Sequence, residues 1–231
     1  MSIIWRVVSA IGDGLYSVGE DIAYGAQRTG QGLGMGKDGR SAEIGYEDRA
    51  LVTLLYGIFK FGITDRENPL YKAISLTLER YYSHLPDKVL ALLAKNAGLA
   101  GGYMAGRMFL GKKLAEAVAV RVSSAVAMTA GYKALATKLG VSAGASATGV
   151  GVVIGGLMIR GVFQRASLAA ERLQRKNFIL YNELYKKGDL QLLYFLVEEP
   201  LAKYIAVISA AERGDKLELE RLIRSHFHRG H

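Results

Sequence analysis

The chain has 231 residues and half of them are hydrophobic, which excludes an intrinsically disordered protein and fits one large domain or two small ones. The absence of cysteine from the sequence excludes disulfide bonds, thiol catalysis and cysteine-based zinc sites. The net charge of +9 indicates an anionic partner, for which nucleic acid, a negatively charged membrane surface and an acidic protein are the candidates.

The first segment with a clear pattern is residues 3–24, where apolar side chains recur every three or four positions. This period predicts a marginal amphipathic helix, which we expect to pack in a core rather than to bind a membrane or a partner. Residues 1–21 lack the basic region and the continuous apolar stretch of a secretory signal peptide. We therefore expect synthesis as a soluble cytoplasmic protein, with export by another route.

Residues 25–48 contain seven glycines, which predicts a loop. We therefore divide the chain into an N-terminal helix and glycine-rich arm, 1–48, and a helical body, 49–231. Gly34, Gly36 and Gly39 formally match a dinucleotide-binding pattern, but no strand precedes them, so a flexible loop is expected there and no cofactor.

The helical body begins with residues 50–63, an apolar run that predicts a buried helix. Asn68 and Pro69 then predict a helix start, since asparagine caps helix N-termini and proline is favoured in the first turn. Leu85 and Pro86 predict a break, after which residues 87–112 restart as one helix.

The C-terminal third has mixed charges and amphipathic periods that predict a helical bundle. Two Gly-Asp pairs, 188–189 and 214–215, are each expected to end one helix and cap the next. Apolar and polar residues never alternate long enough for a strand. The sequence therefore predicts an all-α bundle that encloses a hydrophobic helical hairpin within residues 96–162.

That hairpin centres on residues 139–159, twenty-one residues without a charge. As a helix they would match a hydrocarbon core of about 30 Å. Only nine of them are strongly apolar and the rest are Gly, Ala, Ser or Thr, so the segment is long enough to cross a bilayer but not strongly committed to one. We expect residues 114–132 to form the other arm of the hairpin.

Basic residues flank this hairpin, and Glu116 is the only acid in residues 96–162. We expect Lys133 and Lys138 at its tip and the other basic side chains at lipid head groups, although a solvated helix face is a common reason for such a run. The basic candidates for a membrane surface or hairpin tip are Arg121, Lys133, Lys138, Arg160 and Arg165.

Small residues recur at four-residue spacing in the same block, which places them on one face if the segment is helical. Glycine is unfavourable inside a helix, so aligned glycines indicate close helix packing, as between membrane helices, although tightly packed soluble helices have the same rows. The candidate packing glycines are Gly98, Gly102, Gly106, Gly140, Gly144, Gly151 and Gly155.

A helical domain that encloses a small-residue-rich hydrophobic hairpin resembles the pore-forming domains of colicins, and the chain length resembles the small pore-forming effectors of type VI secretion systems. The resemblance is carried by GLAGGYMAG (98–106) and GVSAGASATGVGVVIGG (140–156). It implies a secreted antibacterial toxin that depolarises the inner membrane of a target cell. It also implies an immunity protein and a secretion-machinery carrier as partners.

No set of residues suited to catalysis stands out, so we do not expect an enzyme. His226, His228 and His231 cluster at the C-terminus, where termini usually fray, and no metal site is expected. The leading prediction is a pore-forming toxin that inserts in the target bilayer, with a homo-oligomer in the membrane and no nucleic-acid partner. The alternative is a soluble helical scaffold that binds an acidic protein.

Overall fold

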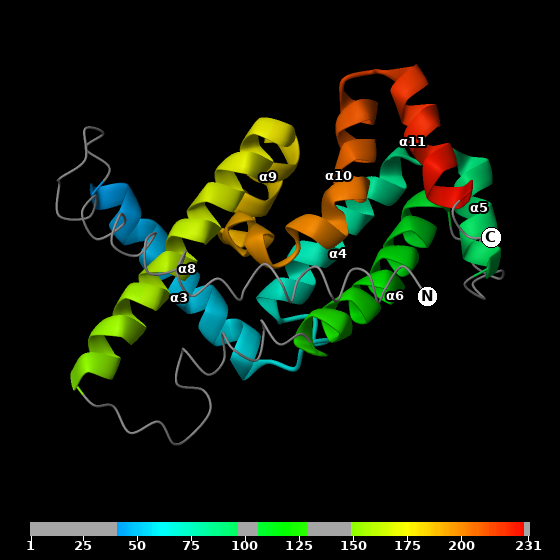
Figure 1. Cartoon of the computed structure of the whole chain (residues 1–231). Helices are drawn as coiled ribbons and strands as arrows, with labels where there is room; N and C mark the ends of the chain where they lie inside the picture. Colours follow the sequence, from blue (N-terminus) through cyan, green and yellow to red (C-terminus); the bar gives the residue numbers. More distant parts are fainter. Residues whose placement is uncertain (1–40, 97–105, 129–148, 229–231) are drawn as a thin grey trace.

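The computed structural model describes residues 41–96, 106–128 and 149–228 (Figure 1). These residues fold as an all-α bundle without a strand, which confirms the predicted fold class. The elements are α3 (Ser41–Lys60), α4 (Pro69–His84), α5 (Asp87–Asn96), α6 (Arg107–Met128), α8 (Gly149–Lys176), α9 (Phe178–Lys186), the 3₁₀-helix η2 (Leu190–Leu196), α10 (Glu198–Glu212) and α11 (Lys216–His228).

Helix α4 is the element around which the others pack. It contacts α6 along one side and α10, η2, α3 and α9 along others, and it runs through the middle of Figure 1. Leu70, Ile74 and Leu78 on α4 are fully buried, so each of three successive turns places one apolar side chain entirely out of contact with water. Full burial of a leucine or isoleucine side chain contributes about 1.5–3 kcal/mol, which makes this helix the main apolar anchor of the fold.

The start of α4 is fixed by Asn68, as predicted. Its side-chain Oδ1 accepts hydrogen bonds from the backbone N–H of Leu70 at 2.9 Å and of Tyr71 at 3.4 Å. Its Nδ2 donates to the carbonyl oxygens of Ile58, at 3.0 Å, and Phe61, at 3.3 Å. Asn68 is fully buried. Its one side chain therefore caps α4 and also supplies hydrogen-bond donors to carbonyl oxygens at the C-terminal end of α3.

The predicted helix over 87–112 is wrong, because α5 ends at Asn96 and α6 begins at Arg107. Gly106 precedes α6 with φ of +88°, a conformation that glycine adopts without strain. Arg107 then donates to Asp87 and to the carbonyl oxygen of Leu85, each within 2.8 Å, and so ties the start of α6 to the end of α4.

The loop predicted for residues 25–48 is wrong for residues 41–48, since these belong to α3, and the division of the chain placed at residue 48 falls within this helix. Ile44 is buried and extends the apolar stripe that continues through Leu51 and Leu55. Within 41–48 only Gly45 opposes a helix, and the other glycines of the predicted loop all come earlier in the sequence. The burial of Ile44 outweighs the cost of one glycine, which is about 1 kcal/mol.

Both predicted Gly-Asp helix ends are confirmed, but only one of the two caps. Gly188 and Gly214 have φ of +102° and +71° and follow the ends of α9 and α10. Asp215 caps α11, because its Oδ1 accepts from the N–H of Glu218 at 3.0 Å. Asp189 instead accepts a hydrogen bond from the hydroxyl of Tyr46 at 2.9 Å, which links η2 to α3.

The helix caps Asn68 and Asp215 can be compared by their effects on the free energy of unfolding. We expect Asn68→Ala to lower the free energy of unfolding by about 2–4 kcal/mol, because it removes a cap and leaves buried carbonyl groups without donors. Asp215→Ala removes an exposed cap alone and is expected to cost about 1 kcal/mol. Urea unfolding followed by circular dichroism measures both values, and equal losses would contradict the double role of Asn68.

Candidate functional site

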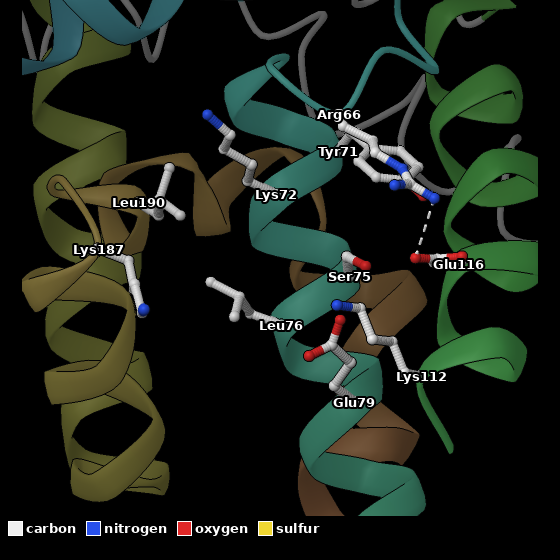
Figure 2. Close-up of a pocket in the computed structure, with 10 residues that line it drawn as sticks. All are labelled: Arg66, Tyr71, Lys72, Ser75, Leu76, Glu79, Lys112, Glu116, Lys187 and Leu190. Carbon is white, nitrogen blue, oxygen red and sulfur yellow. Dashed lines mark hydrogen bonds and ion pairs between the residues drawn. The ribbon is translucent and has the colours of Figure 1, made fainter. Parts of the chain in front are cut away.

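A groove of about 360 Å³ lies over α4. One face of α4 forms its floor, α6 forms one wall, and the junction between α9 and η2 forms the other (Figure 2). Its lining combines cationic, anionic and apolar side chains. The lining residues are Arg66, Tyr71, Lys72, Ser75, Leu76, Glu79, Lys112, Glu116, Lys187 and Leu190.

Helical spacing explains why these residues meet. Tyr71, Ser75 and Glu79 stand four residues apart and therefore share one face of α4. Lys112 and Glu116 stand at the same spacing on α6. The packing of α6 on α4 brings the two rows together.

The groove carries four cations and two carboxylates, so its lining has a surplus of two positive charges when all six are ionised. Glu116 is shared, because it lies 3.3 Å from Arg66 and 3.3 Å from Lys113 outside the groove. Lys72 pairs with Glu67 at 2.6 Å. Among the described residues, neither Lys112 nor Lys187 forms an ion pair with a carboxylate, so these two are the less compensated of the four cations.

Glu79 is the acid that the groove perturbs most clearly. Partial burial raises its pKa above the ordinary value of 4.5, and the neighbouring charge of Lys112 only partly offsets this effect. Burial also raises the pKa of Tyr71, so the phenol stays protonated at neutral pH. The floor of the groove thus holds one carboxylate that is costly to keep ionised.

Beside the groove, α6 presents an outward surface that mixes apolar and basic side chains. Phe109, Lys113, Glu116 and Val120 follow one helical row. The Nζ of Lys113 lies 5.7 Å from the centre of the Phe109 ring, a cation–π contact. We call the exposed side chains of α6 together the α6 surface; besides this row it includes Arg107, Met108, Lys112, Arg121 and Met128, which are exposed on more than one side of the helix.

The predicted hairpin of 114–132 with 139–159 is not formed by the described parts of its arms. Helix α6 packs on α4 and α5, whereas α8 packs on η2, α9 and α3. The two helices lie on opposite sides of α4 (Figure 1). Leu114, Ala119 and Val126 of α6 are buried, and the apolar surface that α4 offers them explains why α6 does not need α8 as a partner.

Gly106 is not part of a helical glycine row, because it precedes α6 in a left-handed conformation. Gly151 and Gly155 lie within α8. Arg121 and Arg160 are exposed, and Arg165 is partly exposed. The remaining predicted site residues lie outside the described part of the chain: Gly98, Gly102, Lys133, Lys138, Gly140 and Gly144.

Among the helices that the structure describes, none combines the length and the apolar character needed for a membrane crossing. His226 and His228 end α11, but their side chains are outside the described part, as is His231. Comparison of the chain with protein-family models, with curated proteins and with solved structures gives no match.

We expect Glu79→Gln to stabilise the protein at pH 7 by less than about 1 kcal/mol, since the side chain is only partly buried. The raised pKa means that folding disfavours the ionised carboxylate, so a neutral amide gains stability wherever Glu79 is ionised. The gain is present at neutral pH and disappears as the pH falls below 4.5, where the carboxyl is protonated in both states.

Urea midpoints at pH 7 and pH 4 measure this difference. Glu220→Gln on α11 is the matched control, because its side chain is 67% exposed, and a change within about 0.5 kcal/mol is expected there at either pH. A loss of stability in Glu79→Gln at pH 7 would show that the ionised carboxylate stabilises the groove instead.

Proposed function

We propose that this protein is a membrane-inserting, pore-forming toxin that acts on anionic bilayers. The observation that carries the proposal is the α6 surface, where exposed apolar side chains are interleaved with basic ones. Met108 is 89% exposed and Met128 is 71% exposed, at opposite ends of the helix. At a lipid interface, exposed apolar side chains enter the acyl boundary and neighbouring basic side chains meet head groups.

The charges of the α6 surface favour an anionic membrane over a neutral one. Arg107, Lys112, Lys113 and Arg121 contribute four positive charges. Asp87 pairs with Arg107 at 2.8 Å, and Glu116 is shared by Arg66 and Lys113, so Lys112 and Arg121 are the charges of this surface that have no carboxylate partner among the described residues. A basic residue near an anionic leaflet contributes about 1 kcal/mol of attraction. The α6 surface therefore supplies enough attraction to concentrate the protein at such a membrane before any insertion.

Insertion is assigned to residues 139–159, the uncharged segment of the sequence. A segment with only nine strongly apolar residues gains less from lipid than an ordinary transmembrane helix, so it needs help from surface binding and from the membrane potential. Moving Lys133 and Lys138 across a potential contributes about 2.3 kcal/mol per charge for each 100 mV. Glycine rows then let inserted helices pair within or between chains.

The resemblance to colicins and to type VI secretion effectors extends this proposal to its biological setting. The protein is synthesised in the cytoplasm, secreted with a carrier of the secretion machinery, and depolarises the inner membrane of a target bacterium. A cognate immunity protein protects the producer. Growth arrest with depolarisation, only when the chain is directed to the periplasm, is the cellular result that supports this setting.

We expect the purified protein to release dye from anionic vesicles and not from zwitterionic ones. Arg121→Glu changes the α6 surface by two charges and is expected to weaken vesicle binding by about 2 kcal/mol, or about thirtyfold. Lys203→Glu makes the same change at an exposed position of α10 and is the control. Sedimentation with vesicles measures binding, and fluorescence dequenching measures release.

Equal weakening by Arg121→Glu and Lys203→Glu would show that net charge alone drives binding and would remove α6 from the proposal. Absence of dye release over a broad range of protein and lipid concentrations would overturn pore formation. That result would favour the alternative function, a helical scaffold whose basic surface binds an acidic protein.

A second change separates membrane binding from pore formation. We expect the double variant Gly151→Leu, Gly155→Leu to abolish dye release while it leaves vesicle binding and the urea midpoint unchanged, because leucine prevents close helix approach in the membrane. A large fall of the urea midpoint would contradict this assignment, since the two glycines would then serve packing within the soluble fold.

A further inference from the structure

We propose that the groove over α4 binds the phosphate group of a phosphate monoester through Arg66, Lys72, Lys112 and Lys187. A phosphate monoester is offered to the protein either by a soluble phosphorylated compound or by a lipid head group with a terminal phosphate. The inference goes beyond the proposed function, because a soluble monoester can occupy the groove in the absence of a membrane.

The net charge of the groove lining is complementary to that of a phosphate monoester. The six charged groups that line the groove, four basic and two acidic, leave a surplus of two positive charges, and Glu67 compensates one of them by pairing with Lys72 at 2.6 Å. A phosphate monoester carries about 1.5 to 2 negative charges at pH 7 and three acceptor oxygens, so it matches the remaining surplus in sign and can also take Lys72 from the exposed Glu67.

The cations of the groove come from separate structural elements. Figure 2 shows Lys112 lying over α4 beside Ser75 and Glu79, whereas Lys187 stands along the opposite wall of the groove, on the other side of Leu76. Their ammonium groups come from α6 and from the end of α9, so the fold, and not one helix, brings them to the same space. The cations therefore flank the groove on both of its walls, and their flexible side chains can turn to one ligand placed over α4.

The carboxylates beside the groove can release their cations to a phosphate ligand. Arg66 has a side chain that is 73% exposed, so its guanidinium can turn from Glu116 to a phosphate at small cost, and it can then bind two phosphate oxygens together. Glu116 keeps Lys113 as its partner after this exchange. Glu79 is the residue that opposes the ligand, because its carboxylate competes for Lys112.

The remaining lining supplies contacts for the organic part of the ligand. Leu76, Leu190 and the ring of Tyr71 are apolar surfaces within the same groove. A volume of about 360 Å³ is at the lower end of the range for small-molecule sites. The groove therefore fits a compact phosphorylated molecule or a lipid head group, and it is too small for a dinucleotide.

Isothermal titration calorimetry of the full chain with glycerol 3-phosphate tests the proposal. The variant Lys112→Gln, Lys187→Gln removes two charges from the groove and is expected to weaken binding by about tenfold or more. The control Lys95→Gln, Lys186→Gln removes two exposed charges outside it, one of them adjacent in sequence to Lys187, and should change binding by less than about twofold. Glu79→Gln should tighten binding, because Lys112 is then freed.

Equal weakening by the two double variants would overturn the site, since it would show attraction by net charge alone. No binding of glycerol 3-phosphate by the wild-type chain would overturn it as well. Glu79→Gln guards against misfolding as an explanation, because tighter binding requires an intact groove, and unchanged or weaker binding in that variant would contradict the assigned geometry.

Vesicles of equal surface charge then identify the source of the phosphate. Preferential binding to phosphatidic acid over phosphatidylserine, lost in Lys112→Gln, Lys187→Gln, would assign the groove to a lipid phosphate monoester. Equal binding to the two lipids, with glycerol 3-phosphate still bound in solution, would assign it to a soluble compound. Dye release is measured in the same samples, so the site is tested separately from pore formation.

Discussion

The burial of α4 is the constraint on which the rest of the described fold depends. Leu70, Ile74 and Leu78 lose all their solvent exposure only if neighbours cover the helix on several sides at once. Asn68 fixes where the helix begins. Near its other end, Arg80 donates to Glu183 at 2.9 Å and to Glu212 at 2.5 Å, which joins α4 to α9 and α10. Both ends are thus held by polar contacts in an otherwise apolar environment.

The functional surfaces are consequences of this arrangement. Because α6 buries one face against α4, the rest of the helix stays exposed and carries the apolar and basic side chains of the α6 surface. Because α9 and η2 cover another side of α4, a strip of the helix between them and α6 is left open as the groove. Membrane attraction and phosphate binding are therefore proposed for neighbouring surfaces that share α6.

The sequence predicted where several helices begin and end, but it did not predict which helices pack against each other. Asn68 and Pro69, and the glycines before Asp189 and Asp215, act through their own backbone geometry, so short motifs identified those helix ends. The pairing of α6 with α4 instead of α8 depends on surfaces far apart in the chain, and the start of α3 depends on the buried Ile44. The groove was not predicted because its cations come from elements that are far apart in the sequence.

The proposed toxin function requires that residues 139–159 enter lipid while the helices around α4 stay folded. Because the chain has no cysteine, one label can be placed by Val150→Cys and a control label by Thr53→Cys on the exposed side of α3. With anionic vesicles, the fluorescence of a polarity-sensitive label at 150 should shift to the blue and be quenched by acyl-chain quenchers, whereas that at 53 should not change. An unshifted label at 150 on fully vesicle-bound protein would contradict the account.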